Sequence, residues 1–335
     1  MELYIKILLC LVITFFVSLI ISPIIISIIK RQKIKQTILH YVESHQAKSG
    51  TPTMGGIIFI ISICLVPIMF FTEYNNLAVM CLVVFLLYGI VGFLDDFIKV
   101  KFKRNLGLRA YQKIIFQLAI SILISIYAYR SNMVGSTLIL PFSGKLINFG
   151  WAVIPLNILV FLACTNSVNL TDGLDGLAAG TTLSYMFSFI LLLFVLSSTA
   201  FAGYSQAFFT QLAGMQFVVA AAIGALICYL IFNCFPAKIF MGDTGSLALG
   251  ALVAGLAIFT RTTLYLPILA IMFVASSVSV IMQVAYYKLT KKRIFLMAPL
   301  HHHFEKKGVH EVRITTSYMT VTLIVGLIVV LLEII

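Results

Sequence analysis

Charged residues are scarce in this sequence. Asp, Glu, Lys and Arg make up 10% of its 335 residues, whereas hydrophobic residues make up 61%. A soluble domain carries more charge at its surface, so the composition excludes one and predicts an integral membrane protein. No stretch between the apolar runs is long enough for a soluble domain. We therefore expect residues 1–335 to form a single integral membrane domain.

Several familiar signatures are also missing. The six Cys lie in or beside apolar runs without paired spacing, which indicates packing residues and neither disulfides nor a zinc site. No P-loop glycine motif is present, so a nucleotide need not be bound as in an ATPase. The first apolar run has no small-residue cleavage site and predicts a retained helix, not a removed signal peptide.

Apolar runs of near 20 residues, the length that a helix needs to cross a bilayer, are abundant. They predict an all-α polytopic membrane protein with about ten transmembrane helices. The runs are Leu3–Ile29, Met54–Phe71, Leu77–Leu94, Ile114–Tyr129, Trp151–Val168, Leu177–Ser197, Leu212–Phe232, Ser246–Phe259, Leu266–Tyr287 and Thr316–Ile334. Between the fourth and fifth runs, the stretches Thr137–Leu140 and Leu146–Phe149 predict a small hairpin.

Positive charge is concentrated in alternate loops. If the first loop is cytoplasmic, the loops on its side carry 19 of the 23 Lys and Arg. The positive-inside rule then places both termini outside the cytoplasm. The predicted cytoplasmic loops lie near residues 30–53, 95–113, 166–176, 233–246 and 288–314. All five Asp of the chain fall at these helix ends: Asp95, Asp96, Asp172, Asp175 and Asp243.

Asp95 and Asp96 stand side by side at the end of an apolar run. An ionised Asp at the centre of a bilayer costs ~2.5–3.5 kcal/mol, so this pair should lie at the water interface, near cations. Pairing of Asp95 with Lys99 along a continuing helix is one simple explanation. The basic residues that follow could instead attract anionic lipid head groups. Neither explanation accounts for a paired acid at the membrane boundary.

Two further segments combine glycine with polar residues. Lys48 to Gly56 offers a cation, hydroxyls and backbone N–H groups to an anion, although an ordinary turn and helix cap is the favoured interpretation of this segment alone. In the segment 166–176, Asp172 and Asp175 would share one face of a helix that starts there. This segment has more polar residues than a cap needs, so a binding function is favoured.

The last two segments leave alternatives open. Asp243 could be only a helix cap, and Phe240 only an interfacial aromatic residue. His301, His302 and His303 cannot all face one way on a helix, so at least one should be free to meet a ligand. Zinc is disfavoured because no Cys accompanies them.

Carboxylates, Lys and His on one membrane face suit metal-assisted phosphoryl transfer, with Mg²⁺ as the hard cation. The residues alone predict a membrane enzyme that acts on a phosphate or diphosphate.

Five motifs occur in order along the chain. They are Thr-Pro-Thr-Met-Gly-Gly, Asp-Asp-x-x-Lys, Asn-Leu-Thr-Asp-Gly-Leu-Asp-Gly, Phe-Met-Gly-Asp-Thr-Gly-Ser and Pro-Leu-His-His-His-Phe-Glu. Together they resemble the polyprenyl-phosphate N-acetylhexosamine-1-phosphate transferases. The His-His-His-Phe-Glu block is most similar to the phospho-N-acetylmuramoyl-pentapeptide transferase branch of that family. The resemblance covers essentially the whole chain, and no departure from the family pattern stands out.

This resemblance implies transfer of phospho-MurNAc-pentapeptide from UDP-MurNAc-pentapeptide to undecaprenyl phosphate, which gives lipid I and UMP in the first membrane step of peptidoglycan synthesis. It also implies ten helices, a homodimer, Mg²⁺, and a cytoplasmic active site in the bacterial cell membrane, among membrane lipid. No nucleic-acid partner is expected. An alternative within the family is a UDP-GlcNAc:polyprenyl-phosphate GlcNAc-1-phosphate transferase, although its His-x-Arg-like pattern is absent here. A remote alternative is a secondary transporter or flippase.

The resemblance also implies roles for individual residues. Asp243 resembles the Mg²⁺ ligand, and Asp95 the base that deprotonates the lipid phosphate. Asp96 assists nearby or, in an alternative family mechanism, is a covalent nucleophile. We favour single displacement, because a phosphate dianion is already a competent nucleophile. The positions that match substrate contacts are Lys48, Thr53, Lys99 and Lys113 around the diphosphate, Asn169, Asp172 and Asp175 along the nucleotide site, Phe240 for stacking on uracil with Asn233 nearby, and His301, His302 and His303 for activity and donor contacts.

Overall fold

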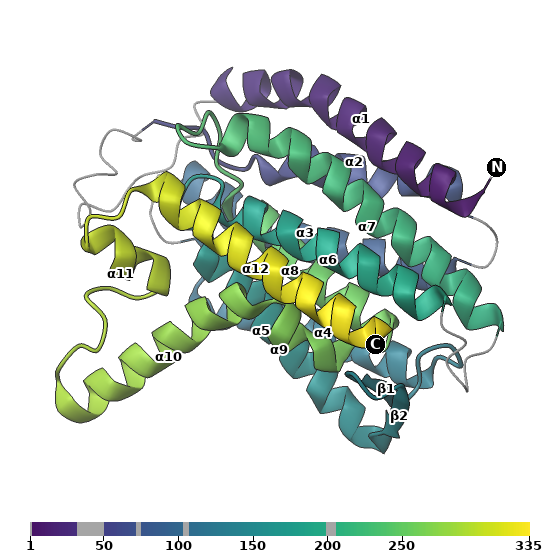
Figure 1. Ribbon diagram of the computed structural model, residues 1–335. Helices are drawn as coiled ribbons and strands as arrows, with labels where there is room; N and C mark the ends of the chain where they lie inside the picture. The colour runs from purple at the N-terminus through teal and green to yellow at the C-terminus, as the bar shows by residue number, and fades with distance from the viewer. Residues whose placement is uncertain (1, 32–49, 72–74, 103–106, 199–205) are drawn as a thin grey trace.

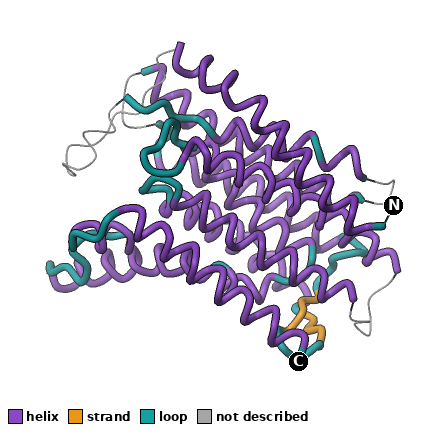
Figure 2. Tube along the Cα trace, turned by 45° about the horizontal axis from the view of Figure 1, so that its top comes forward, coloured by secondary structure: helices purple, strands orange, loops and turns teal. Residues whose placement is uncertain are grey.

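The chain is almost entirely helical in the computed structural model, which describes residues 2–31, 50–71, 75–102, 107–198 and 206–335 (Figures 1 and 2). Within these ranges nine helices are long and apolar enough to cross a membrane, and a further apolar segment, Gly56–Phe70, is shorter. The predicted all-α polytopic class is confirmed. In chain order the elements are α1 Leu3–Arg31, α2 Gly56–Leu65, η2 Pro67–Phe70, α3 Asn76–Lys101, α4 Ala110–Arg130, β1 Thr137–Leu140, β2 Lys145–Asn148, η3 Gly150–Ala152, α5 Val153–Thr171, α6 Leu177–Ser198, α7 Gln206–Asn233, α8 Gly242–Phe259, η4 Thr263–Tyr265, α9 Leu266–Leu269, α10 Ile271–Thr290, α11 Leu300–Lys306 and α12 Glu311–Ile334.

Two of the expected continuous spans are interrupted. The run Met54–Phe71 forms α2, which ends at Leu65, and then the short 3₁₀ helix η2, which begins at Pro67. The run Leu266–Tyr287 forms the four-residue helix α9 and then α10, with Pro267 in the first turn of α9. Proline lacks a backbone N–H and fixes its own φ, so it favours helix starts and breaks at both places.

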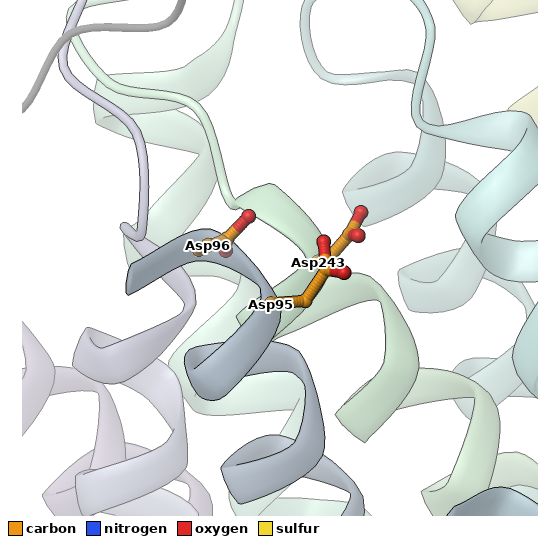
Figure 3. Close-up of side chains that lie close together, drawn as sticks. All are labelled: Asp95, Asp96 and Asp243. Carbon is orange, nitrogen blue, oxygen red and sulfur yellow. The ribbon is translucent and has the colours of Figure 1, made fainter. Parts of the chain in front are cut away.

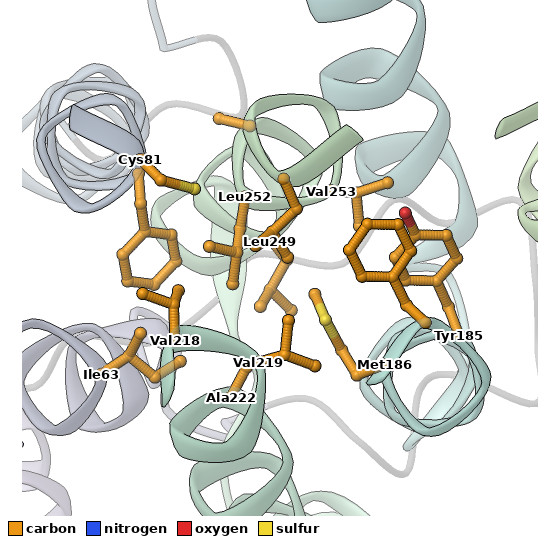
Figure 4. Close-up of a cluster of buried hydrophobic side chains, with 14 of the residues drawn as sticks. Ile63, Cys81, Tyr185, Met186, Val218, Val219, Ala222, Leu249, Leu252 and Val253 are labelled. Atoms are coloured by element: carbon orange, nitrogen blue, oxygen red, sulfur yellow. The ribbon is translucent and has the colours of Figure 1, made fainter. Parts of the chain in front are cut away.

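Helix α8 lies at the centre of the bundle. All its residues from Thr244 to Phe259 are buried, and α2, α3 and α5 pack along it. Its sequence is rich in Gly and Ala, which lets neighbouring membrane helices approach closely. Figure 4 shows its larger side chains, Leu249, Leu252 and Val253, in contact range of side chains from α3, α6 and α7.

The two chain ends lie at the same end of the bundle as the β-hairpin, whereas α11 and the acidic helix ends lie at the other (Figure 1). The predicted hairpin is confirmed, with Thr137 paired to Asn148 and Leu140 to Lys145. The backbone N–H of Phe142 at its tip donates to Glu333 Oε2 over 3.0 Å, which ties the hairpin to the end of α12. Helix α10 leaves the bundle at an angle and is the least buried of the membrane helices in the described ranges (Figure 1).

Candidate active site

Helices α3 and α8 touch at a point where neither has room for a side chain. A Cβ atom added at Gly92 of α3 would lie 2.7 Å from Thr244 Cα of α8, well inside van der Waals contact. Gly242, at the start of α8, has a φ of +69°. A side chain there would collide with the Asp96 carboxylate. These two glycines set Asp95 and Asp96 of α3 beside Asp243 of α8.

Asp95, Asp96 and Asp243 form one carboxylate cluster (Figure 3). One oxygen from each lies within 4.8 Å of the others. Asp95 points toward Asp243, while Asp96 points toward the start of α8 (Figure 3). Asp95 and Asp96 are each only 3% exposed, so their negative charge needs compensation inside the protein.

Two lysines supply that compensation. Lys99 Nζ lies 2.6 Å from Asp95 Oδ2, 2.9 Å from Asp243 Oδ2 and 3.6 Å from Asp96 Oδ1. Lys113 Nζ of α4 lies 3.0 Å from Asp243 Oδ2. Simple pairing along one helix is therefore an incomplete explanation of Asp95 and Lys99, because Lys99 also bridges to a second helix. Two ammonium groups against three carboxylates leave one formal negative charge in the cluster.

The three carboxylates differ in how they are held. Asp96 Oδ2 accepts hydrogen bonds from the backbone N–H of Thr244, over 2.9 Å, and from its hydroxyl, over 2.7 Å. Asp95 Oδ1 accepts the backbone N–H of Leu108 over 2.8 Å. Asp243 Oδ1 accepts a hydrogen bond of 2.7 Å from Asn169 Nδ2. Backbone N–H groups thus donate to Asp95 and Asp96, whereas in these contacts only side chains bind Asp243.

The helix-cap interpretation of Asp243 is wrong. Helix α8 has Met241 at its N-cap and no side-chain cap hydrogen bond, and Asp243 faces the cluster from the first turn. Thr244 was not among the predicted site residues, although it immediately follows Asp243 in the fourth motif. Its hydroxyl could have been suspected there, but its pairing with Asp96, 148 residues earlier, depends on tertiary structure.

The first and fourth motifs pair through their backbones. Gly55 N–H donates to Phe240 O over 2.8 Å, Phe240 N–H to Pro52 O over 2.8 Å, and Gly56 N–H to Met241 O over 3.1 Å. Thr53 is thereby buried next to Gly242 and Asp96, and no side chain caps α2. The turn-and-cap interpretation of this segment is therefore incomplete, while Lys48 lies outside the described residues.

Asn233 and Asp175 hold the loop that carries Phe240. Asn233 is 2% exposed, and its Nδ2 donates to Ile239 O over 2.9 Å. Asp175 Oδ2 accepts the backbone N–H of Ala237 over 2.9 Å. The predicted helical face shared by Asp172 and Asp175 is wrong, because residues 172–176 form turns between α5 and α6. The sharp turn at Gly176, with a φ of +71°, is what glycine allows there.

Asp172 lies half-buried in this turn, beside the carboxylate cluster. Burial, together with the negative charges of Asp243, Asp96 and Asp175, raises the pKa of Asp172 well above its usual range. The neighbouring negative charges that help to raise this pKa would also favour a cation near the turn.

The three His do not all face one way: the rings of His301 and His302 lie side by side, with centroids 4.3 Å apart, whereas His303 lies against Phe295. His301 is fully buried. The rings of His301 and His302 pack against Gly173. A Cβ atom added at Gly173 would collide with the His301 ring and would lie 3.1 Å from His302 Nε2. His302 Nδ1 lies 2.9 Å from Glu305 Oε2, and His303 Nδ1 accepts the N–H of Leu296 over 3.1 Å. Ligand contact by one of them stays a prediction.

The residues of the carboxylate cluster fit a divalent cation. Carboxylate oxygens are the ligands that Mg²⁺ and Mn²⁺ prefer, and here two helices bring three of them together. Across the part of the chain that the structure describes, it is the one grouping of three or more acidic, His or Cys ligands this close together, and the His block contributes none.

Comparisons with known proteins identify the family of the chain. The model of glycosyl transferase family 4 matches residues 77–261, and the first signature of phospho-N-acetylmuramoyl-pentapeptide-transferases matches residues 48–60. The chain is 41% identical to the phospho-N-acetylmuramoyl-pentapeptide-transferase of Clostridioides difficile over 94% of both chains. It is 42% identical to that of Desulfitobacterium hafniense over 92% of both chains. The resemblance of the five motifs is thereby confirmed, and the chain belongs to the phospho-N-acetylmuramoyl-pentapeptide-transferase family.

Proposed function

We propose that this protein transfers phospho-MurNAc-pentapeptide from UDP-MurNAc-pentapeptide to undecaprenyl phosphate, giving lipid I and UMP. The observation that carries the proposal is the carboxylate cluster with its two lysines, placed at one end of a membrane bundle. Such a site offers metal ligands and cations to a diphosphate while the surrounding apolar helices accommodate a lipid carrier.

In this proposal Asp243 holds Mg²⁺, because its carboxylate is bound only by side chains in the contacts described above. Lys99 and Lys113 are long and partly exposed, with side-chain exposures of 32% and 16%, so they can move from Asp243 toward a phosphate. When bound, Mg²⁺ would neutralise diphosphate oxygens as a Lewis acid. Asp95 and Asp96, which backbone groups fix, stay in place and shape the site.

The reaction that we favour is a single displacement. An oxygen of the lipid phosphate forms a bond to the phosphorus that carries MurNAc, and the diphosphate P–O bond breaks, so that UMP leaves with the electron pair. A phosphate monoester has a second pKa of about 6, so most of the lipid phosphate is already a dianion at neutral pH. Asp95 has to accept a proton only from the molecules that are still monoanions. Lys99 and Lys113 offset the negative charge that gathers on the transferred group.

Asp96→Asn should retain measurable turnover. Asp96 Oδ2 already accepts two hydrogen bonds from Thr244, and an Asn oxygen can accept them as well. We expect a loss of about 10- to 100-fold, as for residues that orient a metal site, whereas removal of a covalent nucleophile costs on the order of a millionfold. The measurement is UMP release by the purified variant. A phospho-sugar trapped on Asp96 would contradict single displacement.

Substrate choice is tested by supplying two nucleotide sugars separately. With undecaprenyl phosphate and Mg²⁺, we expect UMP release from UDP-MurNAc-pentapeptide and none above background from UDP-GlcNAc. Release from UDP-GlcNAc alone would favour the related GlcNAc-1-phosphate transferases. Solute flux in sealed vesicles without any UMP release would instead favour a transporter.

The remaining parts of the proposal concern the setting of the site. We propose a homodimer in the bacterial cell membrane, built from single membrane domains, with the site facing the cytoplasm. The charge of the loops supports this orientation, because 19 of the 23 Lys and Arg fall in the sequence segments on the predicted cytoplasmic side, where the carboxylates also fall. Accessibility labelling of Cys introduced at Lys145 and at Lys307 would test it.

A further inference from the structure

One helical turn further along α4 than Lys113, three helices meet at Gln117. Its side-chain Oε1 accepts a hydrogen bond of 3.0 Å from Asn166 Nδ2 of α5. Its backbone carbonyl accepts a hydrogen bond of 3.0 Å from the hydroxyl of Tyr88 of α3. Gln117 and Tyr88 are fully buried. We call Tyr88, Gln117 and Asn166 the Gln117 junction.

The spacing of the junction relates it to Asp243. Gln117 lies four residues after Lys113 on α4, and Asn166 lies three residues before Asn169 on α5. Residues three or four apart stand above one another on a helix. The junction therefore joins α4 and α5 directly beneath the two side chains that contact the Asp243 carboxylate from different helices, over 3.0 Å and 2.7 Å.

Packing alone does not explain the junction. The Nε2 group of Gln117 is buried and has no hydrogen-bond partner among the described residues, so an apolar side chain of the same shape would avoid an unpaired donor. Most buried polar groups have a hydrogen-bond partner, and those that lack one often belong to functional networks. A single hydrogen bond between membrane helices is a modest attraction, but it fixes the register of one helix against the other.

We infer that Gln117 and Asn166 are positioning residues that hold α4 and α5 in the register at which Lys113 and Asn169 orient Asp243. The inference rests on the proposed function only in that Asp243 is taken as the metal ligand. If the Gln117–Asn166 bond is lost, Lys113 and Asn169 no longer meet the carboxylate together, and affinity for a divalent cation falls. Groups that contact a metal ligand, as Lys113 and Asn169 do here, commonly change metal affinity or activity about 10- to 100-fold, so we expect the lower end of that range from residues that position them.

The test uses Mn²⁺ as the probe on the full-length purified protein, with binding followed by electron paramagnetic resonance. The variants are Gln117→Met, which conserves volume, Asn166→Leu, and both together. We expect each single variant to weaken Mn²⁺ binding about tenfold, and the double variant to be no weaker, because all three remove the same bond. Steady-state UMP release at saturating substrate should then need correspondingly more Mg²⁺.

Asn157→Leu is the control, since Asn157 is a second Asn on α5, is buried, and lies nine residues from Asn166, away from the site. It should leave Mn²⁺ affinity unchanged. Unchanged affinity in a folded Gln117→Met variant, equal weakening by Asn157→Leu, or single effects that multiply to about a hundredfold in the double variant would each overturn the inference. If Gln117→Met fails to fold, Asn166→Leu decides, because Asn166 is only half-buried.

The two proposals fail in distinguishable ways. A wild-type protein that binds Mn²⁺ but releases no UMP refutes the proposed function, and the junction is still judged by the Mn²⁺ affinities of its variants. A wild-type protein that releases UMP, with variants of unaltered Mn²⁺ affinity, refutes the junction alone.

Discussion

Asp243→Ala is expected to lower Mg²⁺-dependent UMP release by about a thousandfold or more, because it removes a carboxylate on which both the cation and the two lysines depend. In the structure Asp243 is the meeting point of α3, α4 and α5, through Lys99, Lys113 and Asn169. Without its carboxylate, Lys99 retains Asp95 and Asp96, but Lys113 and Asn169 lose this shared partner. The measurement is UMP release across a range of Mg²⁺ concentrations.

Glu333→Gln is a suitable control for that experiment. Glu333 is a carboxylate at the opposite end of the bundle, where it accepts the N–H of Phe142, and Gln can accept the same hydrogen bond. The control should keep wild-type activity. Equal rates for wild type and Asp243→Ala would overturn the metal assignment, whereas a loss of activity that extra Mg²⁺ fully restores would place the main ligand elsewhere in the cluster.

Gly92→Ala is expected to abolish most activity and to lower the melting temperature, although it adds only one methyl group. That group would lie 2.5 Å from the carbonyl carbon of Asp243 and 2.7 Å from Thr244 Cα. Both are backbone atoms, which cannot rotate away, so α3 and α8 must separate. Overpacking of this kind costs about 1–3 kcal/mol or more in stability. A shift of about 1 Å at a catalytic site can cost on the order of a hundredfold in rate.

Gly89→Ala provides the comparison one turn earlier on the same helix. A methyl group there would lie 3.0 Å from Ile60 Cδ1 and 3.6 Å from Ala248 Cβ. The Ile60 atom is the end of a flexible side chain, so a small rotation should accommodate the change with activity largely retained. The measurements are thermal unfolding and UMP release of the two variants in the same detergent, and we expect Gly92→Ala to be impaired in both and Gly89→Ala in neither. Equal behaviour would show that close α3–α8 contact is not what assembles the site.

Sequence reasoning predicted most of the membrane helices because their apolar runs are a local property. The family resemblance also placed Asp95, Asp96, Lys99, Asn169 and Asp243, which lie in its motifs, and Lys113, which lies outside them, in one site. These residues form one network of contacts. The breaks before Pro67 and at Ala270, and helix α11, were missed. Apolar content continues across each break, and α11 is too short and too polar for a hydropathy signal.

What the sequence could not predict are the contacts that join distant segments. Thr244 holds Asp96 only because Gly92 lets α8 approach α3. Asn233 and Asp175 matched positions at a nucleotide site, yet in the structure their side chains also brace the loop that carries Phe240. A motif shows which residue types recur together, but it does not separate a side chain that meets a ligand from one that holds the loop in place.

The backbone pairing between residues 52–56 and 240–241 has a consequence for synthesis of the protein. Gly55 and Phe240 are separated by 185 residues, and they meet only when α8 takes its place at the centre of the bundle. While the ribosome is still translating the segments between them, the first motif has no partner, and Asp95 and Asp96 lack Thr244 and Asp243. Contacts of such high sequence separation form late, when most of the chain is present. The membrane-insertion machinery therefore receives α3 with two unburied acids at its end, and the site is assembled only after α8 has been released into the bilayer.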